Sequence, residues 1–282
     1  MKIIITGGTG LLGSSITPII TKKFIKTMTL GIKDTADIQC DLTKRSQTDA
    51  TLTEYNPDVI INLVAQTNVD ACELNCQNAY SLNVLAVENC VRYIEKNKNT
   101  FLIQISSDMI YDGPGPHTED NPMPSNTYSL TKYAGELACR GINCCILRTN
   151  FFGNSKISHR KSFSDWIINT AREQKAANLF ANVFFSPLRM ETIGNILCTV
   201  IESSLQGTYN LSSREGLSKR DFAHSVLDTF KLPKTNFVDS TLEEGALKAK
   251  RPFDTRMDPS RLEKALSLTM PTLEQEIYKL KE

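Results

Sequence analysis

Short apolar runs alternate with helix-like patterns along the first half of the chain. The run DVIINLVA, residues 58–65, is almost uninterrupted, which is typical of a strand buried on both faces of a parallel sheet. Apolar residues four apart across residues 82–94 indicate a helix with one buried face. Alternation of this kind predicts a doubly wound parallel α/β sheet. The expected strands are residues 2–6, 27–30, 58–65, 101–107 and 144–149.

The second half of the chain has a less regular pattern. Residues 163–171 are predicted to form a helix, in which we expect Trp166 to belong to the core, and residues 208–211 to form a short strand. Ser218, with an acidic residue three positions later, is typical of the start of a helix. A last amphipathic helix is expected over residues 273–280.

Pro18 conflicts locally with this pattern. A helix that follows the first strand should begin at about Leu11. A proline inside it removes one backbone hydrogen bond and clashes with the preceding turn. We therefore expect either a kink at Pro18 or a different helix boundary.

The composition is that of an ordinary globular protein. Of 282 residues, 40% are hydrophobic and 22% charged, and 32 basic against 31 acidic side chains leave a net charge of +1. This balance argues against a nucleic-acid-binding protein, which usually carries a basic surplus. No apolar run approaches the ~18 residues that cross a bilayer. We therefore expect neither nucleic acid nor a membrane among the partners.

The cysteines and histidines do not form a metal-binding pattern. None of the 8 cysteines belongs to a Cys-x-x-Cys pair, and His117, His159 and His224 lie far from them in the sequence. Zinc sites usually show close ligand spacing, so we expect no metal. Reduced thiols that serve packing, such as the neighbours Cys144 and Cys145, are typical of the cytosol, and we expect a cytoplasmic location.

A glycine-rich loop directly follows the first strand. Gly7, Gly10 and Gly13 recur every three residues between that strand and a helix. Missing side chains let a pyrophosphate approach the backbone, and the following helix presents free N–H groups to it. The pattern Thr-Gly-x-x-Gly-x-x-Gly resembles the loop of the short-chain dehydrogenase/reductase family, which implies a dinucleotide cofactor. The expected cofactor contacts in this loop are Gly7, Thr9, Gly10, Leu11 and Leu12.

The end of the second strand favours one of the two nicotinamide dinucleotides. Many dinucleotide sites place a carboxylate there, on the adenosine ribose hydroxyls. This chain has Lys33 instead, and no carboxylate before Asp34. A lysine attracts a 2′-phosphate, which a carboxylate would repel. We therefore expect NADPH, with NADH as the alternative and a solvated surface lysine as the other interpretation of Lys33.

Tyr128 and Lys132 form a Tyr-x-x-x-Lys motif. On a helix, residues four apart share a face, and an ammonium beside a phenol lowers the tyrosine pKa from ~10 toward the working pH of a general acid. We expect Tyr128 to donate a proton to a substrate carbonyl, and Lys132 to bind the nicotinamide ribose and tune Tyr128. Ser107, at the carboxyl end of a strand, would hydrogen-bond the carbonyl. Ser106 is the alternative hydroxyl, because only one of the two faces the crevice.

Four further stretches resemble one branch of the extended short-chain dehydrogenases, the dTDP-4-dehydrorhamnose reductases. Residues 62–73 resemble its N-x-A-A-x-T-x-V-D-x-x-E stretch and residues 105–113 its S-T-D-Y-V-F-D-G stretch. Residues 147–151 are similar to its R-T-S-W, and residues 251–258 to its late R-P-x-x-S-x-L-D segment. The resemblance covers nearly the whole chain. Ser107 takes the place of the branch's catalytic threonine and keeps the hydroxyl.

The resemblance implies a Rossmann fold with a smaller C-terminal α/β substrate domain. Residues 1–150 would bind the dinucleotide, residues 151–282 mainly the substrate, and a segment near 183–205 would return to the first domain. The implied activity is NAD(P)H-dependent reduction of the C4 ketone of a nucleotide-linked 4-keto-6-deoxy-hexose, in deoxysugar and surface polysaccharide biosynthesis. The implied cofactor residues are Asp41 and Leu42 near the adenine and Ala65 and Gln66 beside the nicotinamide; the implied substrate residues are Val69, Asp108, Met109, Phe151 and Arg251.

Some positions depart from the pattern of the branch. Met109 replaces a tyrosine, Phe151 replaces a tryptophan, and residues 183–188 differ from its Q-x-G-x-P-T segment. Because these positions would touch the sugar or its neighbours, the identity of the sugar stays open. Arginine suits bidentate phosphate binding, and Arg251 is favoured by its motif. The candidates for binding a substrate diphosphate are Arg160, Lys161, Arg189 and Arg251.

Two other functions stay open. A 4-epimerase of the same family uses the same serine, tyrosine and lysine, although such enzymes usually have a longer C-terminal region. A non-catalytic regulatory protein is the second alternative, since the β subunit of methionine adenosyltransferase resembles the same branch; the intact Ser107, Tyr128 and Lys132 argue against it. A 4,6-dehydratase is disfavoured, because Met109 stands where those enzymes have a glutamate. A homodimer is compatible with the fold, in which exposed helix faces often pair.

Overall fold

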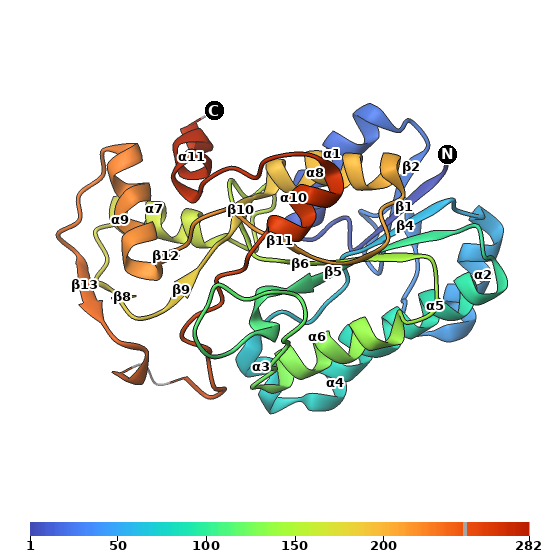
Figure 1. Ribbon diagram of the computed structural model, residues 1–282, viewed down its shortest axis with the longest axis horizontal. Coiled ribbons are helices and arrows are strands. Elements are labelled where there is room, and N and C mark those ends of the chain that lie inside the picture. The colour runs from blue at the N-terminus through green and yellow to red at the C-terminus, as the bar shows by residue number, and fades with distance from the viewer. Residues whose placement is uncertain (245–246, 282) are drawn as a thin grey trace.

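The computed structural model describes residues 1–244 and 247–281 (Figure 1). The centre is a parallel sheet of β1 (Ile3–Thr6), β2 (Thr27–Gly31), β3 (Ile38–Gln39), β4 (Val59–Asn62), β5 (Phe101–Ser107), β6 (Cys144–Thr149) and β11 (Gly207–Leu211). The seven strands lie in the order β11-β6-β5-β4-β1-β2-β3. The order reverses between β1 and β4, so ligands are expected at the carboxyl ends of these strands. The predicted doubly wound parallel sheet is confirmed.

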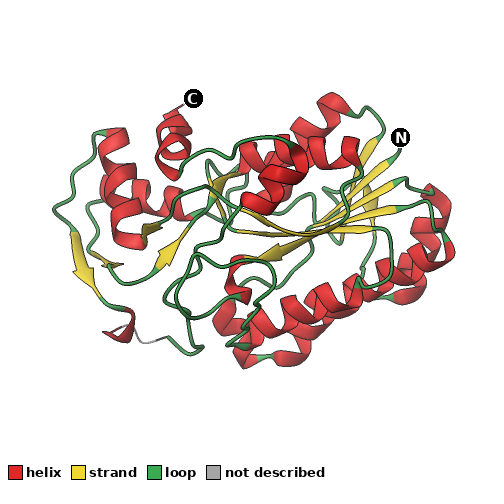
Figure 2. Ribbon diagram, viewed as in Figure 1, coloured by secondary structure: helices red, strands yellow, loops and turns green. Residues whose placement is uncertain are grey.

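Two layers of helices cover the faces of the sheet (Figure 2). The first layer contains α1 (Leu11–Lys23), α8 (Met190–Ser203) and α10 (Ser260–Leu266); the second contains α2 (Arg45–Tyr55), α5 (Ala86–Lys96) and α6 (Thr127–Ala138). Side chains of β1 alternate between them: Ile3 and Ile5 pack into the first layer and Ile4 into the second. Because both faces are buried, the strand sequences are almost uninterrupted apolar runs.

Helix α1 begins at Leu11 as predicted and runs through Pro18. Pro18 is exposed, and Ser14, one turn earlier, is only partly buried. The Ser14 carbonyl loses its helical donor at the proline, but it lies where water can replace that donor. The conflict at Pro18 therefore does not move the helix boundary.

The helix predicted over residues 82–94 starts with a π-helical turn, Ser81–Leu85, and then continues as α5. The turn contains the buried Asn83, which accepts from the backbone N–H of Gln66 at 2.8 Å and donates to the Thr131 hydroxyl at 2.9 Å. It thereby ties the loop after β4 to α6. Two short helices precede the turn, α3 (Val69–Leu74) and α4 (Cys76–Tyr80).

A smaller group of elements extends from one end of the sheet, on the left of Figure 1. Its core is aromatic: the Phe222 ring meets Phe152 and Phe185 edge to face, with ring centroids 4.9 and 5.1 Å apart. The helices predicted in the second half are present, and Ser218 caps one of them. The elements are β7 (Phe151–Phe152), α7 (Phe163–Arg172), β8 (Ala177–Phe180), β9 (Phe184–Phe185), β10 (Leu188–Arg189), β12 (Leu217–Ser218), α9 (Lys219–Phe230), β13 (Phe237–Ser240), η3 (Leu242–Glu244), α11 (Leu273–Tyr278) and η4 (Lys279–Lys281).

The expectation that Trp166 belongs to the core is wrong. Its side chain is 39% exposed. The indole stacks on Phe163 with ring centroids 5.6 Å apart and meets Phe237 edge-on at 6.5 Å. An apolar stripe on a helix does not distinguish a residue inside the core from one that covers its border.

All the cysteines are free thiols, and the neighbours Cys144 and Cys145 differ in burial. Cys145 is buried in β6, whereas Cys144 at the start of the strand is only partly so. No helix within the described residues is both long and apolar enough to cross a membrane.

A buried ion pair joins β6 to α6. Arg148 Nη2 lies 2.6 Å from Glu136 Oε2, and both side chains are 4% exposed. The same guanidinium donates to the Tyr111 hydroxyl at 2.7 Å and to the Glu119 carbonyl at 2.8 Å. Because each charge has a partner inside the protein, the pair holds α6 in one position along the sheet.

Removing one partner of this pair should destabilise the fold strongly. In Arg148→Met, the Glu136 carboxylate stays buried without a partner, and we expect the free energy of unfolding to fall by about 3–5 kcal/mol. Denaturant unfolding measures the loss. The matched control is Lys23→Met, at the exposed Lys23–Glu202 pair, where the loss should stay below about 1 kcal/mol. Equal effects at both sites would show that the buried pair does not hold α6.

Candidate active site

Helix α6 begins beside the carboxyl end of β5, and Tyr128 lies in its first turn. Asn126 caps the helix: its side chain accepts from the backbone N–H of Ser129 at 2.8 Å, and the Ser129 hydroxyl accepts from the Asn126 backbone N–H at 3.1 Å. This reciprocal cap determines where the helix starts. The Tyr128 side chain is 7% exposed. It packs with Cys72 and Ala79, with Val69 and Met109 against them.

Ser107 is the last residue of β5 and acts directly on Tyr128. Its hydroxyl donates to Asp108 Oδ1 at 3.3 Å and accepts from the Met109 N–H at 3.2 Å. Hydrogen bonding by the same hydroxyl lowers the pKa of Tyr128. Neighbouring strand residues face opposite sides of a sheet, and the buried Ser106 hydroxyl has no partner among the described residues. The structure therefore brings Ser107, and not Ser106, to the tyrosine.

The pKa of Tyr128 differs from the prediction. Burial raises it to about 12, although the Ser107 hydroxyl opposes the rise. The Lys132 ammonium donates to the Ile105 carbonyl at 2.7 Å, and the burial of the phenol outweighs any lowering of its pKa by that charge. Burial also lowers the pKa of Lys132 to about 8, against the charge of Glu136. Desolvation thus outweighs the expected tuning by the lysine, and Tyr128 is a neutral phenol at pH 7.

The glycine loop forms a tight cradle at the start of α1. Gly7 has a φ of +66°, which favours glycine, and a Cβ on Gly13 would lie 2.5 Å from the Gly7 carbonyl oxygen and 2.6 Å from Gly8 Cα. The helix begins without a side-chain cap and without an acidic residue in its first turn. Among the described residues, none accepts the backbone N–H groups of Leu11 and Leu12. These free donors at the positive end of a helix fit a phosphate group.

The end of β2 lies next to this cradle. A Cβ on Gly31 would lie 3.8 Å from the Thr9 hydroxyl, so the glycine loop and the end of β2 are neighbours. Lys33 follows β2 on the surface, and its Nζ lies 3.4 Å from His159 Nε2. Two basic side chains from distant segments therefore meet at the position where the sequence predicts a 2′-phosphate.

The remaining predicted cofactor residues lie near the ends of β3 and β4. The Asp41 carboxylate accepts from the backbone N–H and the hydroxyl of Thr43, at 2.9 and 2.7 Å, and so closes a local turn. Leu42 is buried in the core of the second helical layer. Ala65 and Gln66 lie partly exposed in the loop after β4.

A cavity of about 560 Å³ lies between the ends of β5 and β6 and the smaller group of elements. Of the predicted substrate residues, Asp108, Met109 and Arg251 line it. Val69 packs beside Tyr128 instead. Phe151 packs against the core of the sheet, so the structure does not bring it to the cavity. The apolar wall includes Phe163, Trp166, Leu179, Phe180, Leu242 and Leu247.

Asp108 forms the polar end of the cavity, in the short 3₁₀ turn η2 (Asp108–Ile110). It is 2% exposed, and its Oδ2 accepts from Asn150 at 2.6 Å and from the Thr255 hydroxyl at 2.8 Å. Burial raises the pKa of Asp108 against these hydrogen bonds. Lys219 also lines the cavity. Three further residues of this region were not predicted from the sequence: Asn150, Thr255 and Lys219. The first two lie within the family-like stretches 147–151 and 251–258, and Lys219 follows the helix start at Ser218, but no local signal shows that the three meet.

The four basic candidates for diphosphate binding separate in the structure. Arg251 lines the cavity and pairs with Asp70 at 3.0 Å. Arg160 hydrogen-bonds a hydroxyl in the loop after β4. Arg189 is held by the C-terminal helices and does not reach the cavity. Lys161 is exposed. Of the four candidates, Arg251 is therefore the one whose position fits binding of a diphosphate in the cavity.

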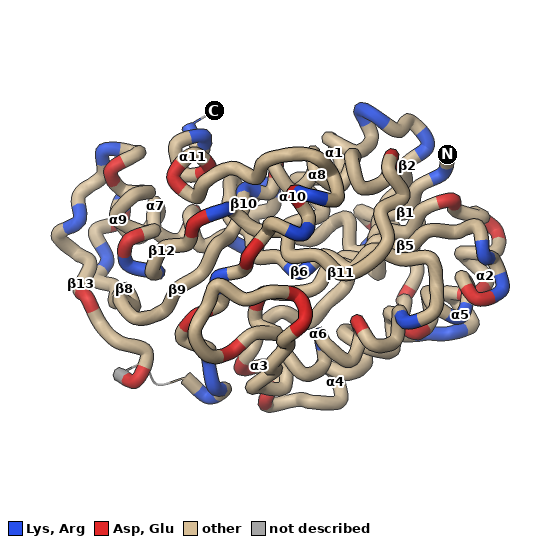
Figure 3. The backbone as a smooth tube through the Cα atoms, viewed as in Figure 1, with Lys and Arg blue, Asp and Glu red and all other residues tan. Residues whose placement is uncertain are grey.

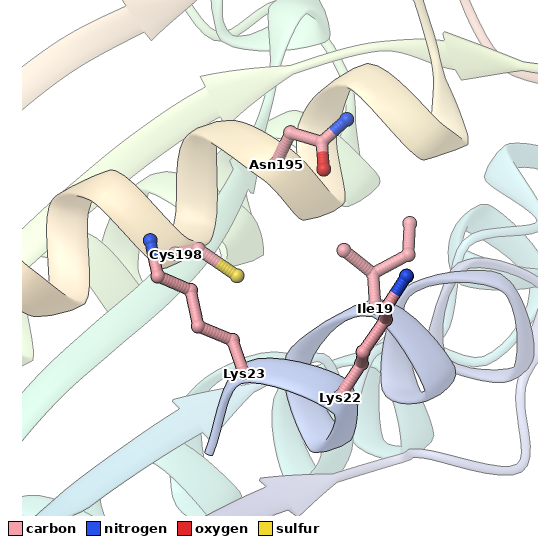
Figure 4. Close-up of a pocket in the computed structure, with 5 residues that line it drawn as sticks. All are labelled: Ile19, Lys22, Lys23, Asn195 and Cys198. Atoms are coloured by element: carbon pink, nitrogen blue, oxygen red, sulfur yellow. The ribbon is translucent and has the colours of Figure 1, made fainter.

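A second cavity, of about 600 Å³, lies between α1 and α8 (Figure 4). Lys22 and Lys23 border it from α1 and Asn195 and Cys198 from α8, together with Ile19. It contains none of the predicted site residues. In the part of the chain that the structure describes, no group of three His, Cys, Asp or Glu side chains could hold a metal ion. Figure 3 shows acidic and basic residues interspersed along the backbone trace. We therefore place the candidate site at the first cavity.

Comparison with known proteins covers the whole chain. The family model described as RmlD substrate binding domain matches residues 1–281. The Haloferax volcanii protein named "Probable low-salt glycan biosynthesis reductase Agl14" is 26% identical over an alignment 292 residues long with its gaps, which covers 99% of this chain and 97% of that protein. The methionine adenosyltransferase 2 subunit beta of Xenopus laevis is 28% identical over an alignment 275 residues long with its gaps, which covers 93% of this chain and 82% of that protein.

A solved structure shares the complete fold. The dTDP-4-dehydrorhamnose reductase of Bacillus anthracis, in complex with NADP, superposes with a TM-score of 0.90 at 25% identity, over 100% of this chain and 99% of that chain. The similarity therefore extends to the smaller group of elements as well as the sheet.

Adding one methyl group at Gly13 should disturb the cradle. In Gly13→Ala the new Cβ meets backbone atoms of Gly7 and Gly8 that cannot move aside, and we expect a loss of about 1–3 kcal/mol in unfolding free energy. Thermal unfolding measures the change. Gly31→Ala is the control, since its Cβ would make only an ordinary 3.6 Å contact with Ala36. If both variants have the Tm of the wild type, the glycine loop has room for a Cβ at Gly13.

Proposed function

The chain belongs to the RmlD substrate binding domain family, and from that premise we propose that it is an NADPH-dependent reductase of a nucleotide-linked 4-keto-6-deoxy-hexose. The observation that carries the proposal is the buried, neutral Tyr128 beside Ser107, next to a cavity with one polar end. The Bacillus anthracis reductase and its NADP support the substrate class and the cofactor. The Haloferax volcanii protein supports a role in glycan synthesis.

Tyr128 is suited to donate a proton. With a pKa of about 12, the phenol keeps its proton at neutral pH. It is too weak an acid to protonate a neutral ketone, so it releases the proton to the carbonyl oxygen only as negative charge develops there. The adjacent Ser107 hydroxyl would turn from Asp108 Oδ1 to donate its hydrogen bond to the same oxygen and stabilise that charge.

The cofactor would lie across the carboxyl ends of the strands. The free N–H groups of Leu11 and Leu12 would hold its pyrophosphate, and Lys33 its 2′-phosphate. Lys132, whose ammonium lies against the β5 backbone, would bind the nicotinamide ribose. Bound NADPH supplies the hydride for the carbonyl carbon.

The cavity would hold the nucleotide sugar. Asp108 and Met109 lie next to Ser107 and so face the reacting sugar, while Arg251 is placed for the diphosphate. The aromatic wall at Trp166 and Phe180 offers a surface for the base. A cytoplasmic location and a homodimer remain predictions.

A direct assay separates this function from the alternatives. Purified protein should oxidise NADPH with a nucleotide 4-keto-6-deoxy sugar, and mass spectrometry should show a product heavier by two hydrogens. An epimerase would change the sugar without net NADPH consumption. A regulatory subunit would consume none and would require a partner enzyme. The complete Ser107–Tyr128–Lys132 set argues against a regulatory subunit, and the similarity to the Bacillus anthracis reductase favours the reductase over the epimerase.

Removing the phenolic hydroxyl should stop reduction without preventing cofactor binding. We expect Tyr128→Phe to lose at least about 100-fold in kcat, the usual contribution of a general acid, with the Kd for NADPH within twofold of wild type. Stopped-flow reduction and fluorescence titration measure the two quantities. Tyr133→Phe, one turn later on α6, is the control. Near-normal turnover by Tyr128→Phe would contradict the proposed mechanism.

Removing the charge at Lys33 should change the cofactor preference. We expect Lys33→Ala to weaken NADPH binding roughly five- to tenfold and NADH binding by less than twofold, because only NADPH carries the 2′-phosphate. Calorimetry with both cofactors gives the ratio. Lys26→Ala, an exposed lysine just before β2, is the control. An unchanged NADPH/NADH ratio would contradict the role of Lys33.

A further inference from the structure

Lys219 is a cation that the fold places inside the substrate cavity. It is the first residue of α9, where the Ser218 hydroxyl accepts from the Asp221 N–H at 3.0 Å. Its own backbone N–H donates to the Val183 carbonyl at 2.8 Å. Cap and backbone bond together fix the position of the Lys219 Cα, so its side chain can reach only the nearby part of the cavity.

The ammonium of Lys219 is held by aromatic rings alone. Its Nζ lies 3.3 Å from the centroid of the Phe185 ring and 4.8 Å from that of Phe163. Among the described residues it has no hydrogen-bond acceptor and no ion-pair partner, although it lines the cavity. Aromatic faces compensate only part of the lost hydration of an ammonium, which keeps three hydrogen-bond donors.

Asp108 lines the same cavity as Lys219 and carries the opposite charge. Its charge favours the protonated lysine, while burial lowers the Lys219 pKa to about 8. The two groups interact through space without forming an ion pair within 4.0 Å. Asp108 receives hydrogen bonds from Ser107, Asn150 and Thr255, and a carboxylate offers about four acceptor positions. At least one acceptor position therefore stays open on Asp108, and a second opens when Ser107 donates to the substrate carbonyl, while the donors of Lys219 in the same cavity are unused.

A hydroxyl group matches this arrangement. It can donate to Asp108 and accept from Lys219 at the same time. A carboxylate or phosphate would also accept from Lys219, but it would place a second negative charge beside Asp108 in a poorly solvated site. The pair is therefore complementary to a neutral, hydroxylated ring, and it lies next to Ser107, where the carbonyl would be.

We propose that Lys219 and Asp108 together bind a ring hydroxyl of the sugar, so that Lys219 is a specificity residue for a neutral hydroxylated sugar and does not bind the diphosphate. This inference rests on the proposed function and extends it to the class of sugar. Arg251, on another segment of the cavity and paired with Asp70, remains the residue placed for the diphosphate.

The test compares binding of a nucleotide sugar with binding of its nucleotide diphosphate. Calorimetry on the full chain with saturating NADP⁺ uses the pairs dTDP-glucose and dTDP, and UDP-glucose and UDP. Lys219→Met keeps the length of the side chain but removes its charge and donors. We expect Lys219→Met to raise the Kd for the nucleotide sugar by at least about tenfold, which corresponds to the loss of one hydrogen bond from a charged donor. The Kd for the nucleotide diphosphate should change by less than twofold.

Two further variants control for structural effects. Arg220→Met changes the adjacent residue, whose guanidinium pairs with Asp221 and Asp239 outside the cavity, and should leave both affinities unchanged. Lys219→Arg keeps a cation that can stack on the aromatic rings and should recover part of the sugar-specific affinity. Thermal unfolding of each variant checks that the fold is intact.

The outcomes separate this inference from the proposed function. If Lys219→Met loses equal affinity for the nucleotide sugar and for the nucleotide diphosphate, Lys219 contacts the phosphates and the inference is wrong. The inference is also wrong if neither affinity falls. If the wild type binds neither pair and reduces no nucleotide keto sugar, the proposed function fails and the inference fails with it. A loss confined to the nucleotide sugar, with wild-type NADP⁺ affinity, supports it.

Discussion

The position of α6 against the sheet is the constraint on which the site depends. Three contacts set it: the buried pair of Arg148 and Glu136, the hydrogen bond from Asn83 to Thr131, and the close approach of Gly135 to the Asn83 carbonyl, which leaves no room for a Cβ. None of the three touches the cavity. They determine where the first turn of α6 lies relative to the end of β5, and therefore whether the phenol and the Ser107 hydroxyl meet.

Low polarity around the site then determines the charge of its groups. Burial keeps Tyr128 protonated and lowers the pKa of both Lys132 and Lys219 to about 8. The Lys132 ammonium donates to a backbone carbonyl, and burial raises the pKa of Tyr128 where the sequence predicts that a neighbouring lysine lowers it. The two residues still point to the same end of the sheet, which is what binding one cofactor ribose and one substrate carbonyl requires.

The sequence was sufficient to predict the sheet, the glycine loop and the Ser107–Tyr128–Lys132 positions, because each depends on local signals. Apolar runs identify buried strands, glycine spacing identifies the loop, and Ser218 identifies the start of α9. Trp166 was misplaced because an apolar residue on a helix face packs equally well inside a core or at the border of a cavity. The π-helical turn at Asn83 could not be predicted, because it changes the backbone hydrogen bonding without changing the pattern of apolar residues.

The cavity could be predicted only in part, since its polar end is assembled from segments far apart in the chain. Asp108, which follows β5, was expected near the substrate, but nothing in the sequence shows that Lys219 at the start of α9 and Thr255 in the late loop join it. Only the packing of the smaller group of elements against the strand ends converts them into a site. The two parts of the site are thereby separated: the sheet and α6 position Ser107 and Tyr128, whereas α9 and the late loop contribute Lys219 and Thr255 to the cavity. A change in α9 therefore alters one wall of the cavity without moving Tyr128 or Ser107.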